Sequence, residues 1–220
     1  MTTFPNSPKL LKAGIVLLNP ETAIMQRVIT LQYNPDSLTR KLQVQGTGEG
    51  GDRTEALRLK GPAAETITLE AEIDATDRLE FPDSNRNTVE LGIHPELALL
   101  ETLVNPHSSE LHDNDRLARE GIIEILPTET FLTIFVWSKQ RVLPVRITEF
   151  SITEEAFDIS LNPIRAKVSL SMRVLNVDDV GFTHNAGRLF MTYMQNKEGL
   201  ANKQPYLGTL SSMGITGEML

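Results

Sequence analysis

The chain has 220 residues, 40% of them hydrophobic, which is enough to bury the core of one large β domain or two small ones. A formal net charge of −8 argues against a general nucleic-acid binder and against docking on anionic lipid by charge alone, because both need a basic surface. The absence of cysteine excludes disulfides, thiolate metal sites and cysteine nucleophiles.

The N-terminal part of the chain predicts strands over residues 12–18, 25–33 and 38–45. The apolar run at 13–18 is shorter than a signal peptide or a membrane span requires, so we expect cytoplasmic synthesis and no direct membrane insertion. Tyr33, Asn34 and Pro35 begin a turn between the second and third strands, since an asparagine before a proline favours one.

A glycine-rich stretch at 45–65 precedes the most regular strand of the first half, at 66–74. The stretch is too long for a tight turn, which predicts a flexible excursion. In the strand, apolar residues from Ile67 to Ile73 alternate with Glu70, Glu72 and Asp74. This period of two predicts an antiparallel sheet with one buried and one solvated face.

The middle of the chain predicts a short helix and then further strands. Pro95 favours a helix start, and Asn105-Pro106 ends the apolar stripe that follows. Residues 107–120 are polar, which indicates a loop or a weakly helical link. Strands are expected over 121–126, 131–137 and 141–152, the last with a β-bulge near Thr148 because its apolar parity shifts there.

The C-terminal part combines a sharp corner, a long strand and a helix. Leu161, Asn162 and Pro163 form the corner, and the strand at 165–174 carries Arg165, Lys167 and Arg173 on its polar face. A helical apolar stripe follows; its members are Phe182, Ala186, Leu189, Phe190, Tyr193 and Met194. Residues 200–220 are more apolar than a disordered tail, so we expect them to pack on a partner.

These elements predict a mainly-β fold of about eight strands, mostly antiparallel, with a mid-chain helix and a C-terminal helix. A small barrel or a sandwich fits best. We expect residues 1–177 to form the β domain and residues 178–220 to supply the C-terminal helix and an extended tail for assembly contacts.

Motifs for catalysis or cofactor binding are weak. His107, His112, Asp113 and Asp115 are close in sequence, but their spacing matches no metal motif. The carboxylates of the strand at 66–74 lack signs of an apolar pocket that would raise one pKa. We therefore expect a protein that is not an enzyme and that has no cofactor.

Three motifs in order carry a family resemblance. They are "ITLQYNPDSLTR" (29–40), "TLEAEIDATD" (68–77) and "FSITEEAFDISLNPIRAKVSLSMRVL" (150–175). Together they resemble the tube-domain proteins of contractile injection systems, which include phage tail-tube proteins. The resemblance covers roughly residues 10–177.

The resemblance implies two packed antiparallel sheets with a helix at the side, assembled as a ring, typically a hexamer. It also implies partners: the tube protein, the spike or hub protein, and baseplate or sheath components. Some family members initiate the tube or adapt it to the baseplate hub. Baseplate members often carry a LysM module, but only 43 residues follow Val177, so no such module is expected here.

A structural subunit that joins the hub to the inner tube is the preferred interpretation. Alternatives are the main inner-tube protein of the same particle, a soluble β-barrel that binds a small ligand or glycan, and a hydrolase whose site is not evident. The expected assembly contacts are Tyr33, Asn34, Pro35, Glu70, Glu72, Asp74, Phe157, Leu161, Asn162, Pro163, Arg165, Lys167, Arg173, Phe190 and Tyr193.

Overall fold

A single antiparallel sheet organises the computed structural model, which describes residues 11–46, 58–121 and 130–203. Within these residues the sheet has seven strands in the order β2-β1-β5-β6-β7-β4-β3. The strands are β1 (Gly14–Leu18), β2 (Met25–Thr30), β3 (Leu38–Gln43), β4 (Ala64–Asp74), β5 (Leu132–Ser138), β6 (Arg141–Phe157) and β7 (Pro163–Val174). The prediction of a mainly-β, antiparallel fold with helices is confirmed.

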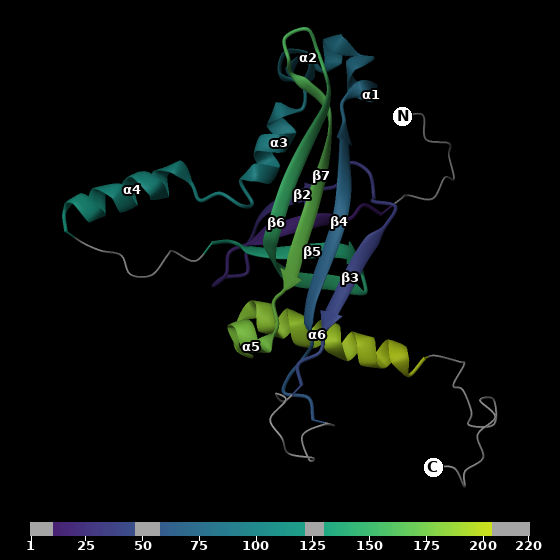
Figure 1. Cartoon of the computed structure of the whole chain (residues 1–220), viewed down its shortest axis with the longest axis vertical. Helices are drawn as coiled ribbons and strands as arrows, with labels where there is room; N and C mark the ends of the chain where they lie inside the picture. The colour runs from purple at the N-terminus through teal and green to yellow at the C-terminus, as the bar shows by residue number, and fades with distance from the viewer. Residues whose placement is uncertain (1–10, 47–57, 122–129, 204–220) are drawn as a thin grey trace.

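The sheet folds back on itself through β6, which is 17 residues long. The first part of β6 pairs with β5, and most of its length pairs with β7. The register shifts between Ile147 and Glu149, which confirms the predicted bulge. A bulge bends its strand and increases the twist. As a result β1, β2 and β5 run across the long strands β4, β6 and β7, and the two layers are halves of one continuous sheet (Figure 1).

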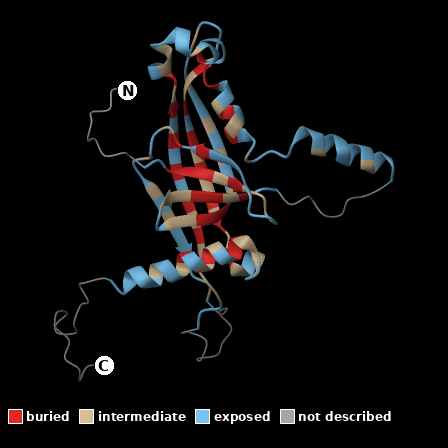
Figure 2. Ribbon diagram, turned by 180° about the vertical axis from the view of Figure 1, so that it is seen from behind, coloured by how far each residue is buried: buried red, intermediate tan, exposed pale blue. Residues whose placement is uncertain are grey.

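The main core lies on the inner face of the long strands. Both predicted alternations are confirmed, because the nine residues predicted to point inward from β4 and β7 are all at most 8% exposed. These residues are Ile67, Leu69, Ala71, Ile73, Ala166, Val168, Leu170, Met172 and Val174. Burying a Val, Leu or Ile side chain contributes about 1.5–3 kcal/mol, so the alternation fixes which face is inside. The buried residues concentrate where the two half-sheets cross (Figure 2).

Both predicted helices are present. α3 (His94–Glu101) has Pro95 in its first turn and packs Leu97 and Leu100 into the core. α6 (Asn185–Ala201) lies across one end of the long strands, and the short α5 (Val177–Val180) precedes it (Figure 1). The expectation that Phe182 belongs to the buried stripe of α6 was wrong. Phe182 precedes the helix and is 66% exposed, because His184 caps the helix start by accepting a hydrogen bond from the Ala186 amide.

The remaining helices were not predicted or were predicted only weakly. α1 (Thr76–Leu79), the 3₁₀ turn η1 (Pro82–Ser84) and α2 (Arg86–Leu91) connect β4 to α3. The polar segment after α3 forms a full helix, α4 (Ser108–Arg119), none of whose residues is buried. Residues 47–57, most of the expected strand at 121–126, and the tail at 204–220 lie outside the described residues.

Candidate assembly surface

The face of β6, β7, β4 and β3 that points away from the core carries several facing residues of opposite charge and one like-charged pair, Arg146 opposite Arg173. Asp74 lies opposite Arg165, and Glu72 lies opposite Lys167, between β4 and β7. Arg165 also lies opposite Glu155 of β6. Opposite charges on facing residues stabilise a strand pair. The six charged residues among the predicted contacts on β4 and β7 share one face with Glu155; they are Glu70, Glu72, Asp74, Arg165, Lys167 and Arg173.

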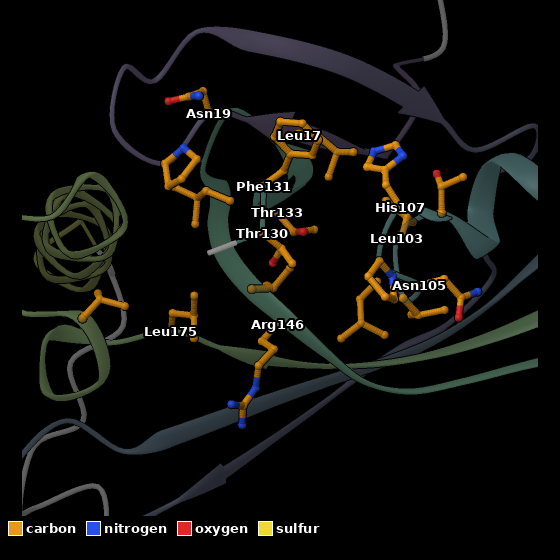
Figure 3. A pocket seen from close by; sticks show the side chains of 18 of the residues that line it. Leu17, Asn19, Leu103, Asn105, His107, Thr130, Phe131, Thr133, Arg146 and Leu175 are labelled. Atoms are coloured by element: carbon orange, nitrogen blue, oxygen red, sulfur yellow. The ribbon is translucent and has the colours of Figure 1, made fainter. Parts of the chain in front are cut away.

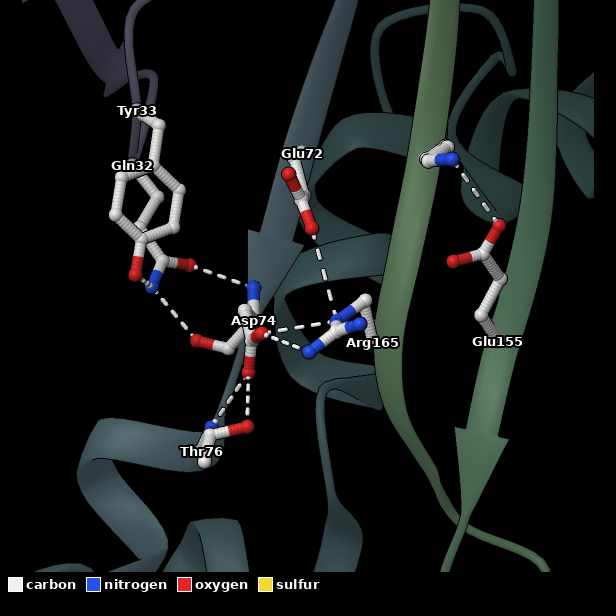
Figure 4. A network of polar contacts seen from close by, with 8 residues as sticks. Gln32, Tyr33, Glu72, Asp74, Thr76, Glu155 and Arg165 are labelled. Atoms are coloured by element: carbon white, nitrogen blue, oxygen red, sulfur yellow. Dashed lines mark hydrogen bonds and ion pairs between the residues drawn. The ribbon is translucent and has the colours of Figure 1, made fainter.

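Arg165, near the start of β7, contacts two carboxylates on this face (Figure 4). Its guanidinium lies 2.9 Å from a carboxylate oxygen of Asp74 and 3.6 Å from one of Glu72. Burial alone would raise the pKa of Asp74, but hydrogen bonds from Thr76 and Arg165 outweigh it, and the pKa lies below its ordinary value. Hydrogen bonding to Asp74 in turn raises the pKa of Arg165. These contacts hold the charges in position, although exposed ion pairs contribute little to stability.

Two further cations on β7 are paired within the chain. Lys167 lies 3.4 Å from Glu155, and Arg173 lies 2.8 Å from Asp179 in α5. Reversing the charge of these cations would therefore disturb contacts within the subunit itself. Glu70 lies opposite Ser169 and is exposed on the same face.

The four-stranded half-sheet has an open edge on each side. Residues 146–157 of β6 pair with β7, and within the described residues nothing pairs with their other edge. β3 is the terminal strand on the opposite side. Beyond β3, Gln32 satisfies the backbone of β4 at Asp74: its side-chain amide accepts from the Asp74 N–H at 3.0 Å and donates to the Asp74 carbonyl at 2.6 Å (Figure 4).

The corner between β6 and β7 is held by Asp158. Its carboxylate accepts hydrogen bonds from the amides of Ser160 and Asn162 and from the Asn162 side chain, at 2.7–2.8 Å. Those from Asn162 chiefly lower the pKa of Asp158. Leu161 adopts a φ of +64°, a left-handed conformation that costs an ordinary residue about 1–2 kcal/mol. Phe157 and Leu161 are exposed, at 49% and 77%.

The corner also fixes the helical segment that precedes α3. Asn162 donates to the Glu90 carbonyl at 3.1 Å, and Pro163 accepts from the Ile93 amide at 2.9 Å. Gly92 between them has a φ of +59°, and a Cβ there would lie 2.3 Å from the Pro163 carbonyl oxygen. The Leu-Asn-Pro corner therefore sets the direction of β7 and, through buried Pro163, the position of α2.

The predicted turn residues at 33–35 have mixed roles. Asn34 links the start of the described chain to the turn. Its side chain accepts a hydrogen bond from the Ala13 amide at 2.9 Å and donates one to the Leu11 carbonyl at 2.8 Å. Tyr33 is 42% exposed and its hydroxyl lies 3.3 Å from the Gln32 amide nitrogen. Pro35 is half-buried. Of these three residues, Tyr33 is therefore the one that is exposed without holding the turn in place.

Phe190 and Tyr193 are enclosed within the subunit, at 3% and 4% exposed. The Tyr193 hydroxyl accepts from Arg40 at 2.9 Å and lies 3.4 Å from the Glu65 carboxylate. Arg40 contacts Glu65 at 2.6 Å, and Lys197 lies 3.7 Å away from it. Burial chiefly raises the pKa of Tyr193, and the hydrogen bond to Glu65 raises that of Arg40. This cluster attaches α6 to β3 and β4, so we leave Phe190 and Tyr193 out of the proposed surface.

A cleft of about 770 Å³ lies between the end of β1, the start of β5 and the link from α3 to α4 (Figure 3). Its walls are mixed: Leu17, Leu103 and Phe131 are apolar, whereas His107 and Arg146 are polar. Asp113 and Asp115 on α4 pair with Arg116 and Arg119 of the same helix. Among the residues that the structure describes, no group of three His, Asp or Glu could hold a metal ion.

Comparisons with known proteins identify no family for this chain. No family model matches the chain, and no curated protein matches its sequence. A chain from the tail of an empty GTA particle with C6 symmetry aligns over 74% of this chain and 90% of its own length, with 8% identity and a TM-score of 0.27. A TM-score below 0.5 does not establish a shared fold. Among the described helices, none combines the length and the apolar character needed to cross a bilayer.

Proposed function

We propose that the chain is a non-enzymatic structural subunit of a contractile injection system, a phage-tail-like particle. Copies form a ring, a hexamer by family resemblance, that joins the spike or baseplate hub to the inner tube. Its partners are the tube protein, the hub and baseplate or sheath components, and it assembles in the cytoplasm. One observation carries this proposal: the half-sheet β6-β7-β4-β3 has open edges on both sides and a charged face.

The two edges lie on opposite sides of the half-sheet, so they can serve a repeated contact. The open edge of β6 in one copy can pair with β3 of the next copy. The same contact repeated by a rotation closes into a ring, and the half-sheets then form one continuous barrel wall. An open edge of 12 residues in β6 is an aggregation hazard for an isolated protein, and ring pairing would remove it.

The faces of the half-sheet suit such a wall. The apolar face is covered within the subunit by β1, β5, α3 and α6. The opposite face carries Glu72, Asp74, Arg165 and Lys167, and it would line the channel of the ring. Acidic and basic side chains alternate there, so the lining would be polar without a strong net charge of either sign. The main inner-tube protein remains the alternative function, since the same contacts would build it.

Cysteine cross-linking tests the ring contact cleanly because the chain has no cysteine of its own. One variant carries Thr39→Cys on β3 together with Thr153→Cys on β6; both positions are exposed on edge strands. Under mild oxidation we expect a ladder of covalent oligomers that stops at the size of the closed ring. A matched control pairs Thr39→Cys with Ser169→Cys on the central strand β7.

The control should remain monomeric on a denaturing gel, because β7 is paired on both sides within the subunit. Two further variants replace Thr153→Cys by Ser151→Cys or by Glu149→Cys, on the same face of β6. They test β3–β6 pairings whose register is shifted by two or four residues. Each variant is measured from micromolar protein up to the concentration of the chain in sedimented particles. The ring contact is refuted if none of the β3–β6 cysteine pairs gives more cross-linked product than the control.

A further inference from the structure

We propose that Arg146 of β6 and Arg173 of β7 form an oxyanion site that binds a carboxylate of an acidic protein segment. The site lies at the end of the half-sheet that is farther from the β6–β7 corner, on the face that points away from the core. Both arginines belong to one subunit, so the site is complete without the ring. The inference therefore goes beyond the proposed function and holds or fails independently of it.

The two arginines lie opposite each other where β6 pairs with β7. Met172 and Val174, the neighbours of Arg173, are buried, so Arg173 and the facing Arg146 project from the other face of the strands. Facing residues of an antiparallel pair have Cβ atoms about 4.5–5.5 Å apart, and like charges at such a separation destabilise the pairing. An anion held between the two guanidinium groups would turn this repulsion into two attractions.

The contacts within the subunit leave much of both guanidinium groups available. Arg173 Nη2 lies 2.8 Å from a carboxylate oxygen of Asp179, but Arg173 Nε is buried and has no hydrogen-bond partner in the part of the chain that the structure describes. Arg146 is exposed, and its side chain has no ion pair or hydrogen bond with a described residue. Figure 3 shows it pointing away from Thr130 and Phe131 of the cleft. Arg146 thus presents a whole guanidinium group, with its N–H donors, to a ligand.

The same row of the half-sheet continues across β4 and β3. Thr66 of β4 lies opposite Arg173, and Lys41 of β3 lies opposite Thr66. Lys41 is exposed and has no ion pair with a described residue. Neighbouring strands lie about 4.8 Å apart, so Lys41 is about 10 Å from Arg173 across the sheet, close enough for its long side chain to approach the same ligand. The row therefore adds a third cation and a hydroxyl group that can donate a hydrogen bond to an oxyanion.

The charges around the row favour a single carboxylate as the ligand. A planar guanidinium group can bind a carboxylate or a phosphate through two parallel hydrogen bonds. Asp179 contacts Arg173, and Glu149 follows Arg146 on the same face of β6, so negative charge already borders the site. This charge repels a doubly charged phosphate more than a carboxylate, and Glu70 farther along the face adds to the repulsion of a nucleic acid. The occupant is therefore an acidic segment of a protein.

Binding of a dye-labelled glutamate peptide to the full chain tests the site, with fluorescence anisotropy as the readout. We expect saturable binding that weakens as the salt rises from about 0.1 M to about 1 M, because the Debye length falls from about 10 Å to about 3 Å. Arg146→Gln should lower the affinity about tenfold, since a charge-assisted contact is lost. Arg86→Gln is the matched control, because it makes the same change at an exposed position of α2, and it should leave the affinity unchanged.

Two further measurements separate binding from a structural role. Without the peptide, Arg146→Gln should raise the free energy of unfolding, because the repulsion from Arg173 is removed. A structural role for Arg146 predicts the opposite sign. Arg173→Lys keeps the positive charge but lacks the planar guanidinium group, so the affinity for the peptide should fall by a smaller factor than in Arg146→Gln.

Four results would overturn the inference: no binding of the peptide, an unchanged affinity in Arg146→Gln, a lower free energy of unfolding in that variant, or tighter binding of inorganic phosphate or of a single-stranded oligonucleotide than of the peptide. The β3–β6 cysteine ladder is measured separately, without the peptide. A ladder without peptide binding refutes the oxyanion site alone, whereas peptide binding without a ladder refutes the ring on which the proposed function depends.

Discussion

The Glu65 cluster gives a quantitative prediction about the attachment of α6. Glu65 is 3% exposed, and its carboxylate contacts Arg40 at 2.6 Å and lies 3.4 Å from the Tyr193 hydroxyl. Glu65→Gln keeps the shape and removes the charge. Because Arg40 and Lys197 retain 26% and 34% exposure, water can solvate them in the variant. We therefore expect a loss of about 1.5–3 kcal/mol, the range for hydrogen bonds to charged groups, instead of the larger cost of a fully buried broken pair.

Glu155→Gln is the matched control, because it makes the same chemical change in an exposed pair. Glu155 and Lys167 are 3.4 Å apart with 37% and 45% exposure, which predicts a loss of about 0–1 kcal/mol. The assay is urea unfolding followed by circular dichroism, with the free energy extrapolated to water. Equal losses in the two variants, or no loss for Glu65→Gln, would refute the assignment of the cluster as the anchor of α6.

Three further predictions concern backbone strain and pH. Gly92→Ala should lower the free energy of unfolding by about 1–3 kcal/mol because of the positive φ at this position. Gly199→Ala should raise it by about 0.5–1 kcal/mol, because this glycine lies in a helix with open space around it. Urea unfolding of both variants checks the two opposite signs. Leu161→Gly should raise the free energy of unfolding by up to about 1 kcal/mol in the same assay, because the φ of +64° at this position suits glycine. Folding lowers the pKa of Asp74, so the ionised carboxylate stabilises the fold above its ordinary pKa of about 3.9, and this stabilisation is lost as the pH falls through the lowered pKa. Asp74→Asn should therefore lower the free energy of unfolding at pH 7 and reduce its loss below about pH 4. A variant that loses as much stability in acid as the original chain would contradict this.

The strand patterns were predictable because burial on one face imposes a period of two. Ile67 to Ile73 and Ala166 to Val174 point inward as their alternation indicates. The bulge near Thr148 followed from the parity shift in β6, and it is the feature that lets one strand belong to both half-sheets. What alternation does not show is the order of strands, since the pairing of β4 with β7 joins segments about a hundred residues apart.

The helices between β4 and α3 were not predictable by periodicity because each is too short to show a full apolar stripe. α1 has four residues and α2 has six, and tertiary contacts such as the Asn162–Glu90 hydrogen bond hold them. α4 contains no buried residue, so its helical form shows no apolar stripe in the sequence. Its signal is the acidic and basic spacing of Asp115 and Arg119, which is i to i+4.

The candidate surface was predicted in part. The charged residues of β4 and β7 share one face because their parity requires it, and the network around Arg165 arises there. Phe190 and Tyr193 lie on the inner stripe of α6, and a sequence stripe alone does not say whether the partner is the same chain or another. Glu65 was missed although it had a signal, since it falls on the apolar parity of Ile67 and Leu69. Gln32 had none, because its bonds to Asp74 depend on the folded path of the chain.

The most direct test of the central claim is the copy number of this chain in the particle. High-molecular-mass particles sedimented from the source cells would be analysed by quantitative mass spectrometry, with a co-sedimenting sheath protein as the internal standard. The account predicts that the chain sediments with the sheath, at one ring per particle for a hub adaptor or at a copy number that matches the sheath for the main inner-tube protein. Absence of the chain from sheath-containing particles would contradict the structural role.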